Sequence, residues 1–207
     1  MDETDGGRGE ATSGADYAAR LTRLESSAWK RLLNVQAPYR WNLKRLHLGR
    51  VLDVGCGIGR NLGHLDGNGV GVDHNPDSIA VARERGLTAY VPQDFLRSPD
   101  AREGSFDSML VAHVLEHLHA DAADELLRTY LPFVRPGGRV VLITPQEVGY
   151  RSDETHVRFV DARELQRQAH SLGLAVTRSY SFPFPRAAGK VFAYNEFVVV
   201  ADRSPSG

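Results

Sequence analysis

The sequence predicts a doubly wound α/β domain, in which a mainly parallel sheet carries helices on both faces. Between residues 50 and 172, short apolar runs alternate with amphipathic segments of helical length. This alternation is typical of βαβ units, whose right-handed crossovers build a parallel sheet. The last two apolar runs are joined by residues 182–191, which are rich in Pro and Gly and hold no helix-length segment. We therefore expect seven strands, with the last two antiparallel to each other.

Each expected element is bounded by residues that begin or end it. The expected strands are 50–54, 69–73, 88–91, 106–112, 139–144, 174–181 and 192–201, and the helices between them include 76–85, 120–134 and 161–172. Pro76 suits the first turn of a helix, because its missing N–H would have no intrahelical partner there. The run Pro136-Gly137-Gly138 is expected to end the second of these helices, and Gly173 is expected to cap the third.

The composition is that of one domain with a sizeable core. The chain has 207 residues, of which 42% are hydrophobic and 25% charged, and its net charge is -1. We therefore expect no tight binding to nucleic acid and none to an acidic membrane. Cys56 is the only cysteine, which excludes an internal disulfide and fits a reducing compartment. Because the sequence has no signal-peptide or membrane-spanning pattern, we expect a cytoplasmic protein.

The chain divides into three expected parts. Residues 1–15 are expected to be a disordered lead, residues 16–48 an N-terminal helical cap, and residues 49–203 the main domain. The cap interleaves basic with aromatic residues, a pattern that suits RNA binding, a solvated helix face or a lid over a cleft. We favour the solvated face and the lid. In a lid, Tyr39, Arg40 or Trp41 would contact a cofactor carboxylate or a sugar ring.

A glycine-rich loop follows the first expected strand. Gly55, Gly57 and Gly59 alternate with other residues between an apolar strand and a helix. Glycine permits positive φ and lets a ligand approach the backbone closely. In an open α/β sheet, such a loop lies at the carboxyl ends of the strands, where ligands bind. A tight strand-to-helix turn without a ligand gives the same local pattern, so the loop alone does not establish a ligand-binding site.

Acidic residues follow the next two expected strands. Asp73 ends the second strand, where an acid can accept hydrogen bonds from both ribose hydroxyls of a nucleotide cofactor. Asp94 and Phe95 follow the third strand, where an acid can bind an adenine amino group and an aromatic ring can stack on adenine. Either acid alone can be a simple turn or cap residue. Their coincidence with the glycine loop at three successive strand ends favours a nucleotide-like cofactor.

Taken together, these motifs resemble class I S-adenosylmethionine-dependent methyltransferases, which have a Rossmann-like fold. The similarity covers about residues 49–200 and includes the runs D-V-G-C-G-I-G at 53–59, Q-D-F at 93–95, F-D-S-M-L-V at 106–111 and L-P-F-V-R-P-G-G-R-V-V-L at 131–142. The resemblance implies S-adenosylmethionine as cofactor, with the glycines at its methionine part, Asp73 at the ribose, and Asp94 with Phe95 at the adenine. The expected cofactor-binding residues are Asp53, Gly55, Gly57, Gly59, Asp73, His74, Asp94, Phe95 and His113. Dinucleotide-dependent dehydrogenases are less similar, because their third glycine falls one position later, at Arg60 here.

A cluster of histidine and glutamate follows the fourth expected strand. His113, Glu116 and His117 share one face if this segment begins a helical turn. His156 lies in the loop after the fifth strand, which opens at the same edge of the sheet. Two imidazoles and a carboxylate on one face can bind a divalent ion. The expected metal ligands are His113, Glu116, His117 and His156.

The cluster also resembles the metal-dependent O-methyltransferases of ubiquinone biosynthesis and of small-RNA 2′-hydroxyl methylation. The similarity consists of H-x-x-E-H at 113–117 and T-H-x-R-F at 155–159, although the related pattern usually begins E-x-x-E-H, with glutamate at the place of His113. Mg2+ or Mn2+ is the expected ion. Two alternatives stay open: the residues pack beneath the cofactor, or His117 or His156 acts as a general base without a metal.

The sequence thus predicts transfer of a methyl group from S-adenosylmethionine to a hydroxyl of a small polyhydroxylated acceptor, with a sugar or oligosaccharide favoured. A divalent metal would bind neighbouring hydroxyls of that acceptor and lower the pKa of the attacking one. His117 and His156 are the expected catalytic residues. A metal-independent N- or C-methyltransferase and a cofactor-binding module without catalysis remain alternatives, and the oligomeric state stays open.

Overall fold

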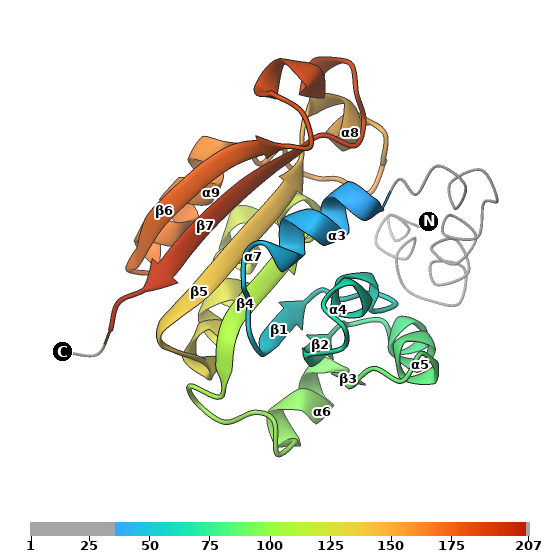
Figure 1. Cartoon of the computed structure of the whole chain (residues 1–207), viewed down its shortest axis with the longest axis vertical. Coiled ribbons are helices and arrows are strands. Elements are labelled where there is room, and N and C mark those ends of the chain that lie inside the picture. The colour runs from blue at the N-terminus through green and yellow to red at the C-terminus, as the bar shows by residue number, and fades with distance from the viewer. Residues whose placement is uncertain (1–35, 206–207) are drawn as a thin grey trace, which may run out of the picture.

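The structure, a computed structural model, describes residues 36–205 and contains a seven-stranded sheet with the strand order β3-β2-β1-β4-β5-β7-β6 (Figure 1). The strands are β1 (Val51–Val54), β2 (Gly69–Val72), β3 (Ala89–Tyr90), β4 (Phe106–Ala112), β5 (Val134–Pro145), β6 (Leu174–Phe182) and β7 (Glu196–Arg203). The first five strands are parallel, whereas β7 lies antiparallel between β5 and β6. The predicted mainly parallel sheet and its antiparallel last pair are therefore confirmed.

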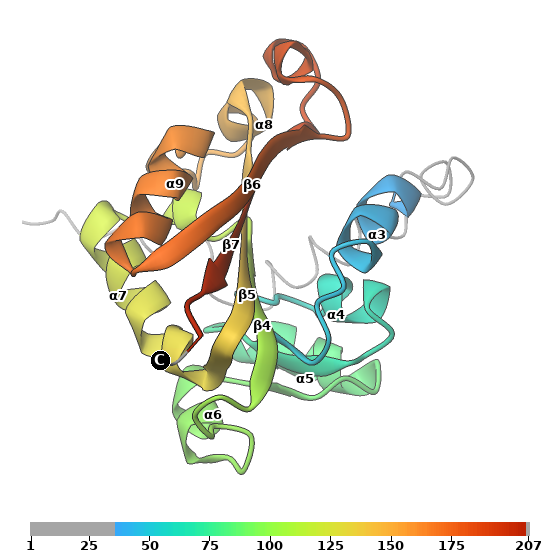
Figure 2. The ribbon, with the colours of Figure 1, turned by 60° about the vertical axis from the view of Figure 1, so that its left-hand side comes forward.

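Helices cover both faces of this sheet, as Figure 2 shows. The helices are α3 (Ala37–Lys44), α4 (Arg60–His64), α5 (Pro76–Glu84), α6 (Pro92–Arg97), α7 (Ala120–Tyr130), α8 (Glu147–Arg151) and α9 (Ala162–Ser171), and the 3-10 turns are η1 (Leu115–His117), η2 (Leu131–Phe133) and η3 (Arg186–Lys190). One face packs against α6, α7 and α9, and the other against α3, α4 and α5. The predicted doubly wound arrangement is confirmed.

Alternate residues of a strand point to opposite faces of a sheet, and this divides the core into layers. In β1, Leu52 and Val54 belong to the layer shared with α7 and α9, whereas Val51 belongs to the layer shared with α3. All three side chains are buried, as expected for a parallel strand covered on both faces. The two layers hold the strands in register, and the carboxyl ends of β1, β2 and β4 therefore meet at one edge.

One expected helix boundary is wrong. Helix α7 ends at Tyr130 instead of continuing to residue 134, and the Pro-Gly-Gly run at 136–138 lies inside β5. Pro132 explains the early end, because proline has no N–H to donate within a helix and its ring clashes with the preceding turn. The chain forms the turn η2 at this point instead. By contrast, Gly173 has φ +73° directly after α9, as expected for a C-cap.

Two expected strand starts are also wrong. Strand β5 begins at Val134 instead of residue 139 and includes the Pro-Gly-Gly run. The last strand begins at Glu196 instead of residue 192, because residues 183–195 leave the sheet as an excursion that contains η3. The buried side chain of Asn195 holds this excursion by accepting a hydrogen bond from the Phe184 N–H and donating one to the Phe184 carbonyl. The excursion and α8 lie at the same end of the sheet (Figure 1).

The expected N-terminal cap is described in part. The expected disordered lead and the first helix of the cap fall in residues 1–35, outside the described residues. Helix α3 confirms the second, shorter helix of the cap, and Leu43 and Leu46 pack into the core layer on that face of the sheet. Along residues 36–205, none of the helices is both long and apolar enough to cross a membrane.

Candidate active site

The glycine loop joins the end of β1 to α4 and adopts the backbone conformation expected of it. Gly55 has φ +77°, and a Cβ at this position would come within 2.1 Å of the Val114 side chain. Both the conformation and the close approach therefore require glycine. The Gly57 N–H donates a hydrogen bond of 2.8 Å to Oδ2 of Asp73, which ties the loop to the end of β2. Gly59, with φ +78°, precedes the first residue of α4.

A cavity of about 250 Å3 opens beside this loop, at the carboxyl ends of β1, β2 and β4. Its polar end is lined by Gly55, Asp73 and His74, and its apolar end by Leu118, Leu126 and Tyr130. Asp73 is only 7% exposed, and its Oδ1 accepts a hydrogen bond from the Asn75 N–H. The cavity therefore offers a carboxylate to ribose hydroxyls and an apolar slot to a purine ring.

The structure corrects the expected adenine contacts. Phe95 is fully buried in the core, where its ring centroid lies 5.1 Å from that of Phe133 and 5.9 Å from that of Tyr130. Asp94 is exposed on the first turn of α6, and neither residue lines the cavity. The reason is that helix α6 begins at Pro92, directly after β3, and turns Phe95 inward. Pro92 itself lines the cavity.

Asp53 lies buried at the end of β1, below the glycine loop. Neither of its carboxylate oxygens has a hydrogen-bond partner among the described residues. Burial raises the pKa of Asp53 to about 7, the nearby side chain of Asn61 lowers it, and the charge of Asp73 raises it further. A buried carboxyl group without a partner is costly, and a positively charged donor from a ligand would satisfy it.

The segment after β4 does not form the helical turn that the spacing predicts. His113 has φ +58°, and the chain then forms the 3-10 turn η1. As a result, the His113 ring lies between two carboxylates: its Nε2 is 2.8 Å from Glu196, and its Nδ1 is 3.4 Å from Glu116. Glu196 is the first residue of β7 and comes from 83 residues away, so no local sequence signal predicted it.

These carboxylates set the charge of the His113 imidazole. Burial of part of the ring lowers the pKa, but the contacts with Glu116 and Glu196 outweigh this effect and raise the pKa to about 10. The ring is therefore a cation at neutral pH, and a protonated imidazole has no lone pair to offer a metal. His113 does line the cofactor cavity, in agreement with its expected place near the cofactor.

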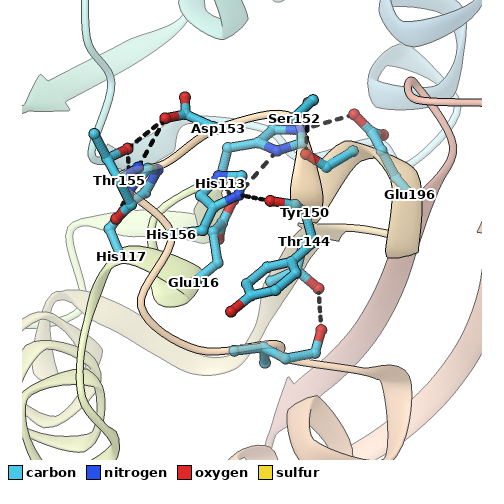
Figure 3. A network of polar contacts seen from close by, with 12 residues as sticks. His113, Glu116, His117, Thr144, Tyr150, Ser152, Asp153, Thr155, His156 and Glu196 are labelled. Atoms are coloured by element: carbon cyan, nitrogen blue, oxygen red, sulfur yellow. Dashed lines mark hydrogen bonds and ion pairs between the residues drawn. The ribbon is translucent and has the colours of Figure 1, made fainter.

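Three of the four expected metal ligands do come together. Glu116, His117 and His156 each place a ligand atom within 4.8 Å of the others, as Figure 3 shows in part. Glu116 is fully buried, and neither of its oxygens accepts a hydrogen bond from residues 36–205, although the His113 ring lies at ion-pair distance. Nε2 of His156 lies 4.0 Å from Oε1 of Glu116. His113 does not belong to this cluster.

Main-chain contacts bring His156 to the cluster. The N–H groups of Val157 and Arg158 both donate to the carbonyl oxygen of Glu116, at 2.9 and 3.1 Å. These bonds dock the loop after β5 against η1, which confirms the expectation that this loop folds over the same edge. We refer to Glu116, His117 and His156 as the donor cluster.

Both imidazoles of the donor cluster are engaged through Nδ1. The Nδ1 of His156 lies 2.6 Å from the Tyr150 carbonyl oxygen, and that of His117 lies 3.2 Å from the Thr155 carbonyl oxygen. Each Nδ1 can donate its proton there, which leaves the lone pair on Nε2. Burial lowers the pKa of His117, and although Glu116 raises it, the net effect is a neutral ring near pH 7. Two imidazoles with hydrogen-bonded Nδ1 atoms and a buried carboxylate that accepts no hydrogen bond from the described residues fit a divalent metal ion.

The expected lid residues occupy a second edge of the site. Tyr39, in α3, lines a small cavity together with Asn61, His113 and Glu196, and its hydroxyl donates a hydrogen bond of 2.6 Å to the Tyr194 carbonyl. Arg40 and Trp41 do not line this cavity, and Trp41 is 57% exposed. Helix α3 therefore contributes Tyr39 to the site and connects it to the 183–195 excursion.

Comparison with known proteins finds methyltransferases among the relatives of this chain. A family model described as a methyltransferase domain matches residues 21–179. The ubiquinone biosynthesis O-methyltransferase of Methylobacterium sp. (strain 4-46) is 26% identical over 91% of this chain and 95% of its own length. The ribosomal protein L11 methyltransferase of Ralstonia pickettii (strain 12J) is 37% identical, but the match covers 49% of this chain and 34% of that relative.

Solved structures share the fold. The methyltransferase in a complex with the Trm112 methyltransferase activator of Haloferax volcanii superimposes with a TM-score of 0.68, at 20% identity, over 93% of this chain and 96% of that one. Magnesium protoporphyrin IX methyltransferase from Synechocystis PCC 6803, with bound SAH, gives a TM-score of 0.65 at 13% identity, over 92% of this chain and 95% of that one. At these identities the likeness concerns the fold.

The family match extends over most of the chain and includes the glycine loop, the acid at the end of β2 and the cavity between them. The cavity lies where an open α/β sheet binds its ligand, at the carboxyl ends of the strands. The chain belongs to the methyltransferase domain family and is a class I S-adenosylmethionine-dependent methyltransferase.

Proposed function

We propose that the protein transfers a methyl group from S-adenosylmethionine to a hydroxyl oxygen of a small acceptor, with a divalent metal held by Glu116, His117 and His156. One observation gives this proposal its main support. His117 belongs to the donor cluster and also lines the cofactor cavity, so the cluster adjoins the place where the reactive methyl group would lie. The name of the Methylobacterium relative, an O-methyltransferase, is consistent with a hydroxyl acceptor.

The chain's own residues would bind and orient the two reactants. Asp73, which lines the cavity, would hold the ribose hydroxyls. The buried carboxyl of Asp53 below the glycine loop would compensate the positively charged amino group of the methionine part. Most of the rate would come from alignment of the acceptor oxygen with the sulfonium methyl group, because methyl transfer needs in-line approach. A metal in the donor cluster would supply Lewis acidity that lowers the pKa of the acceptor hydroxyl.

A second role is available to the histidines. His117 is neutral near pH 7 and lines the cavity, so it can accept the proton that the hydroxyl loses. The His113 cation also compensates the charge of Glu116, which favours a metal-free alternative in which the donor cluster is structural. That alternative suits an N- or C-methyltransferase.

We propose a sugar or oligosaccharide end as the acceptor. Two exposed aromatic side chains belong to elements that border the site, Trp41 on α3 and Tyr194 on the excursion, and both are 57% exposed. Aromatic faces of this kind can pack against the apolar face of a sugar ring. The Tyr39–Tyr194 hydrogen bond joins the two elements that carry them.

We also propose a small acceptor in place of nucleic acid. Several arginines of the described surface are paired with acids, which removes the free positive charge that a phosphate backbone needs. The pairs include Arg50 with Asp100, Arg135 with Asp107 and Arg139 with Asp202. A submicromolar RNA affinity that falls steeply with salt would contradict this proposal.

The test is release of S-adenosylhomocysteine with panels of sugars, catechols, amines and carbon acids as acceptors. We expect turnover with vicinal hydroxyls, loss of most turnover in EDTA, and recovery when a divalent ion is restored. Turnover with amines alone, unaffected by EDTA, would replace O-methylation by the metal-free alternative. Calorimetric binding of S-adenosylhomocysteine without turnover on any panel would indicate a module without catalysis.

A further inference from the structure

We infer that the donor cluster selects a divalent transition metal, such as Zn2+ or Co2+, and discriminates against Mg2+. This inference depends on the metal-binding part of the proposed function and concerns which ion the site takes. The expectation from sequence was Mg2+ or Mn2+, whereas the donor set of two imidazoles and a single carboxylate favours a different ion.

The first argument is the donor set. The donor cluster offers two imidazole nitrogens and one carboxylate. Mg2+ prefers oxygen ligands and binds through carboxylates and water, whereas imidazole suits Zn2+, Co2+ and related ions. Two histidines and one glutamate also form the ligand set of known zinc sites.

The second argument is that the cluster which the described residues form includes no second carboxylate. Glu196 is on the far side of the His113 ring, which it contacts at 2.8 Å through Nε2. Asp153 is occupied locally, because its Oδ1 accepts hydrogen bonds from both the N–H and the hydroxyl of Thr155. His113 therefore separates the only nearby acid on β7 from Glu116.

The third argument is the orientation of the two imidazoles. His156 donates from Nδ1 to the Tyr150 carbonyl, and His117 is bonded through Nδ1 to Thr155. These main-chain contacts direct Nε2 of His156 toward Glu116 and disfavour rotation of either ring. A cation that cannot accept nitrogen ligands would meet a single carboxylate here.

The experiment is metal binding to the full chain, stripped with EDTA and dialysed. Co2+ is titrated first, because its visible d–d absorption reports nitrogen coordination without any turnover, and Zn2+, Mn2+ and Mg2+ then compete. We expect Co2+ and Zn2+ to bind on the order of 100-fold more tightly than Mg2+, with Mn2+ between them. Displacement of Co2+ by Mg2+ at similar concentrations would overturn the inference, and so would the absence of any cobalt spectrum.

Variants connect this preference to His113. His113→Glu replaces the separating ring by a carboxylate next to Glu116, and we expect its Mg2+ affinity to rise on the order of tenfold. His119→Glu introduces the same carboxylate at an exposed position outside the donor cluster and should leave Mg2+ affinity unchanged. His156→Ala should abolish the cobalt spectrum. Equal effects of the two glutamate variants would reduce the preference to net charge and contradict our account.

Turnover is measured separately, so that the two proposals fail in different ways. Turnover on hydroxyl acceptors that persists in EDTA would end metal assistance but leave O-methylation standing. A cobalt spectrum without hydroxyl turnover would sustain the metal preference and end the proposed reaction. If His113→Glu does not fold, the ratio of Zn2+ to Mg2+ affinity of the unmodified chain still decides the inference.

Discussion

The Nδ1–H of His156 donates a hydrogen bond of 2.6 Å to the carbonyl oxygen of Tyr150, and the Tyr150 ring stacks on the imidazole at a centroid distance of 5.4 Å. The hydrogen bond fixes the tautomer whose lone pair is on Nε2, the atom that lies 4.0 Å from Glu116. The ring is thus oriented toward the donor cluster by the protein itself. Tyr150 belongs to α8, so this short helix positions a proposed catalytic residue.

His156→Ala is expected to lower turnover on the order of 100-fold, because it removes one donor of the cluster. The affinity for S-adenosylhomocysteine should stay within about twofold, since His156 does not line the cofactor cavity. Product release and calorimetry measure the two quantities. His119→Ala, exposed and outside the donor cluster, is the matched control. A lower melting temperature with unchanged turnover would instead assign His156 to packing.

Asp73→Ala is expected to weaken S-adenosylhomocysteine binding by about 2–4 kcal/mol, because charge-assisted bonds to ribose are lost. The substitution also removes the acceptor for the Gly57 N–H, which holds the glycine loop. Calorimetry at fixed salt gives the affinity. Asp77→Ala, in the first turn of α5 and outside the cavity, should leave it unchanged. Preferential binding of NAD to the unmodified protein would contradict the cofactor assignment.

The sheet and the glycine loop could be predicted from sequence because their signals are local. Apolar runs mark the strands, and the alternating glycines after β1 require positive φ at known positions. Strand order at the edge then brings Asp73 to the loop. A connection between the last two strands was expected, but the full length of the excursion at 183–195 was not. The Asn195 side chain holds the excursion through hydrogen bonds to residues about ten positions away, which no local pattern indicates.

The site could be predicted only in part, because two of its features are not local. Phe95 was expected at the adenine, but the turn of α6 directs it into the core. His113 was expected to be a metal ligand, and helical spacing with Glu116 supported that view. Its positive φ and its bond to Glu196 have no counterpart in a spacing pattern, since they depend on where β7 begins.

Phe95→Ala is expected to cost about 3–5 kcal/mol of unfolding free energy, since a fully buried ring would leave a cavity in the core. Urea denaturation of the ligand-free protein measures this loss. Phe95→Leu, which keeps most of the volume, should retain both the fold and the affinity for S-adenosylhomocysteine. A stable Phe95→Leu variant with strongly reduced affinity would restore the expected stacking role.

Asp53→Asn is expected to stabilise the ligand-free protein in a pH-dependent manner. Burial raises the pKa of Asp53 from 3.8 to about 7 in the folded state. Between these values the folded protein holds a proton that the unfolded chain has released, so the stability of the unmodified protein falls as pH rises from about 4 to 7 and the penalty is constant above that range. The asparagine variant does not have this penalty. Its gain in unfolding free energy should therefore be absent near pH 4, grow toward pH 7 and level off, as urea titrations at several pH values would measure. A gain that is equal at all pH values would mean that the pKa of Asp53 is not raised in the folded protein.

The same variant should bind S-adenosylhomocysteine more weakly, because the carboxylate proposed to compensate the ligand's amino group is gone. Unchanged affinity of the variant for S-adenosylhomocysteine would contradict the proposed contact with the cofactor.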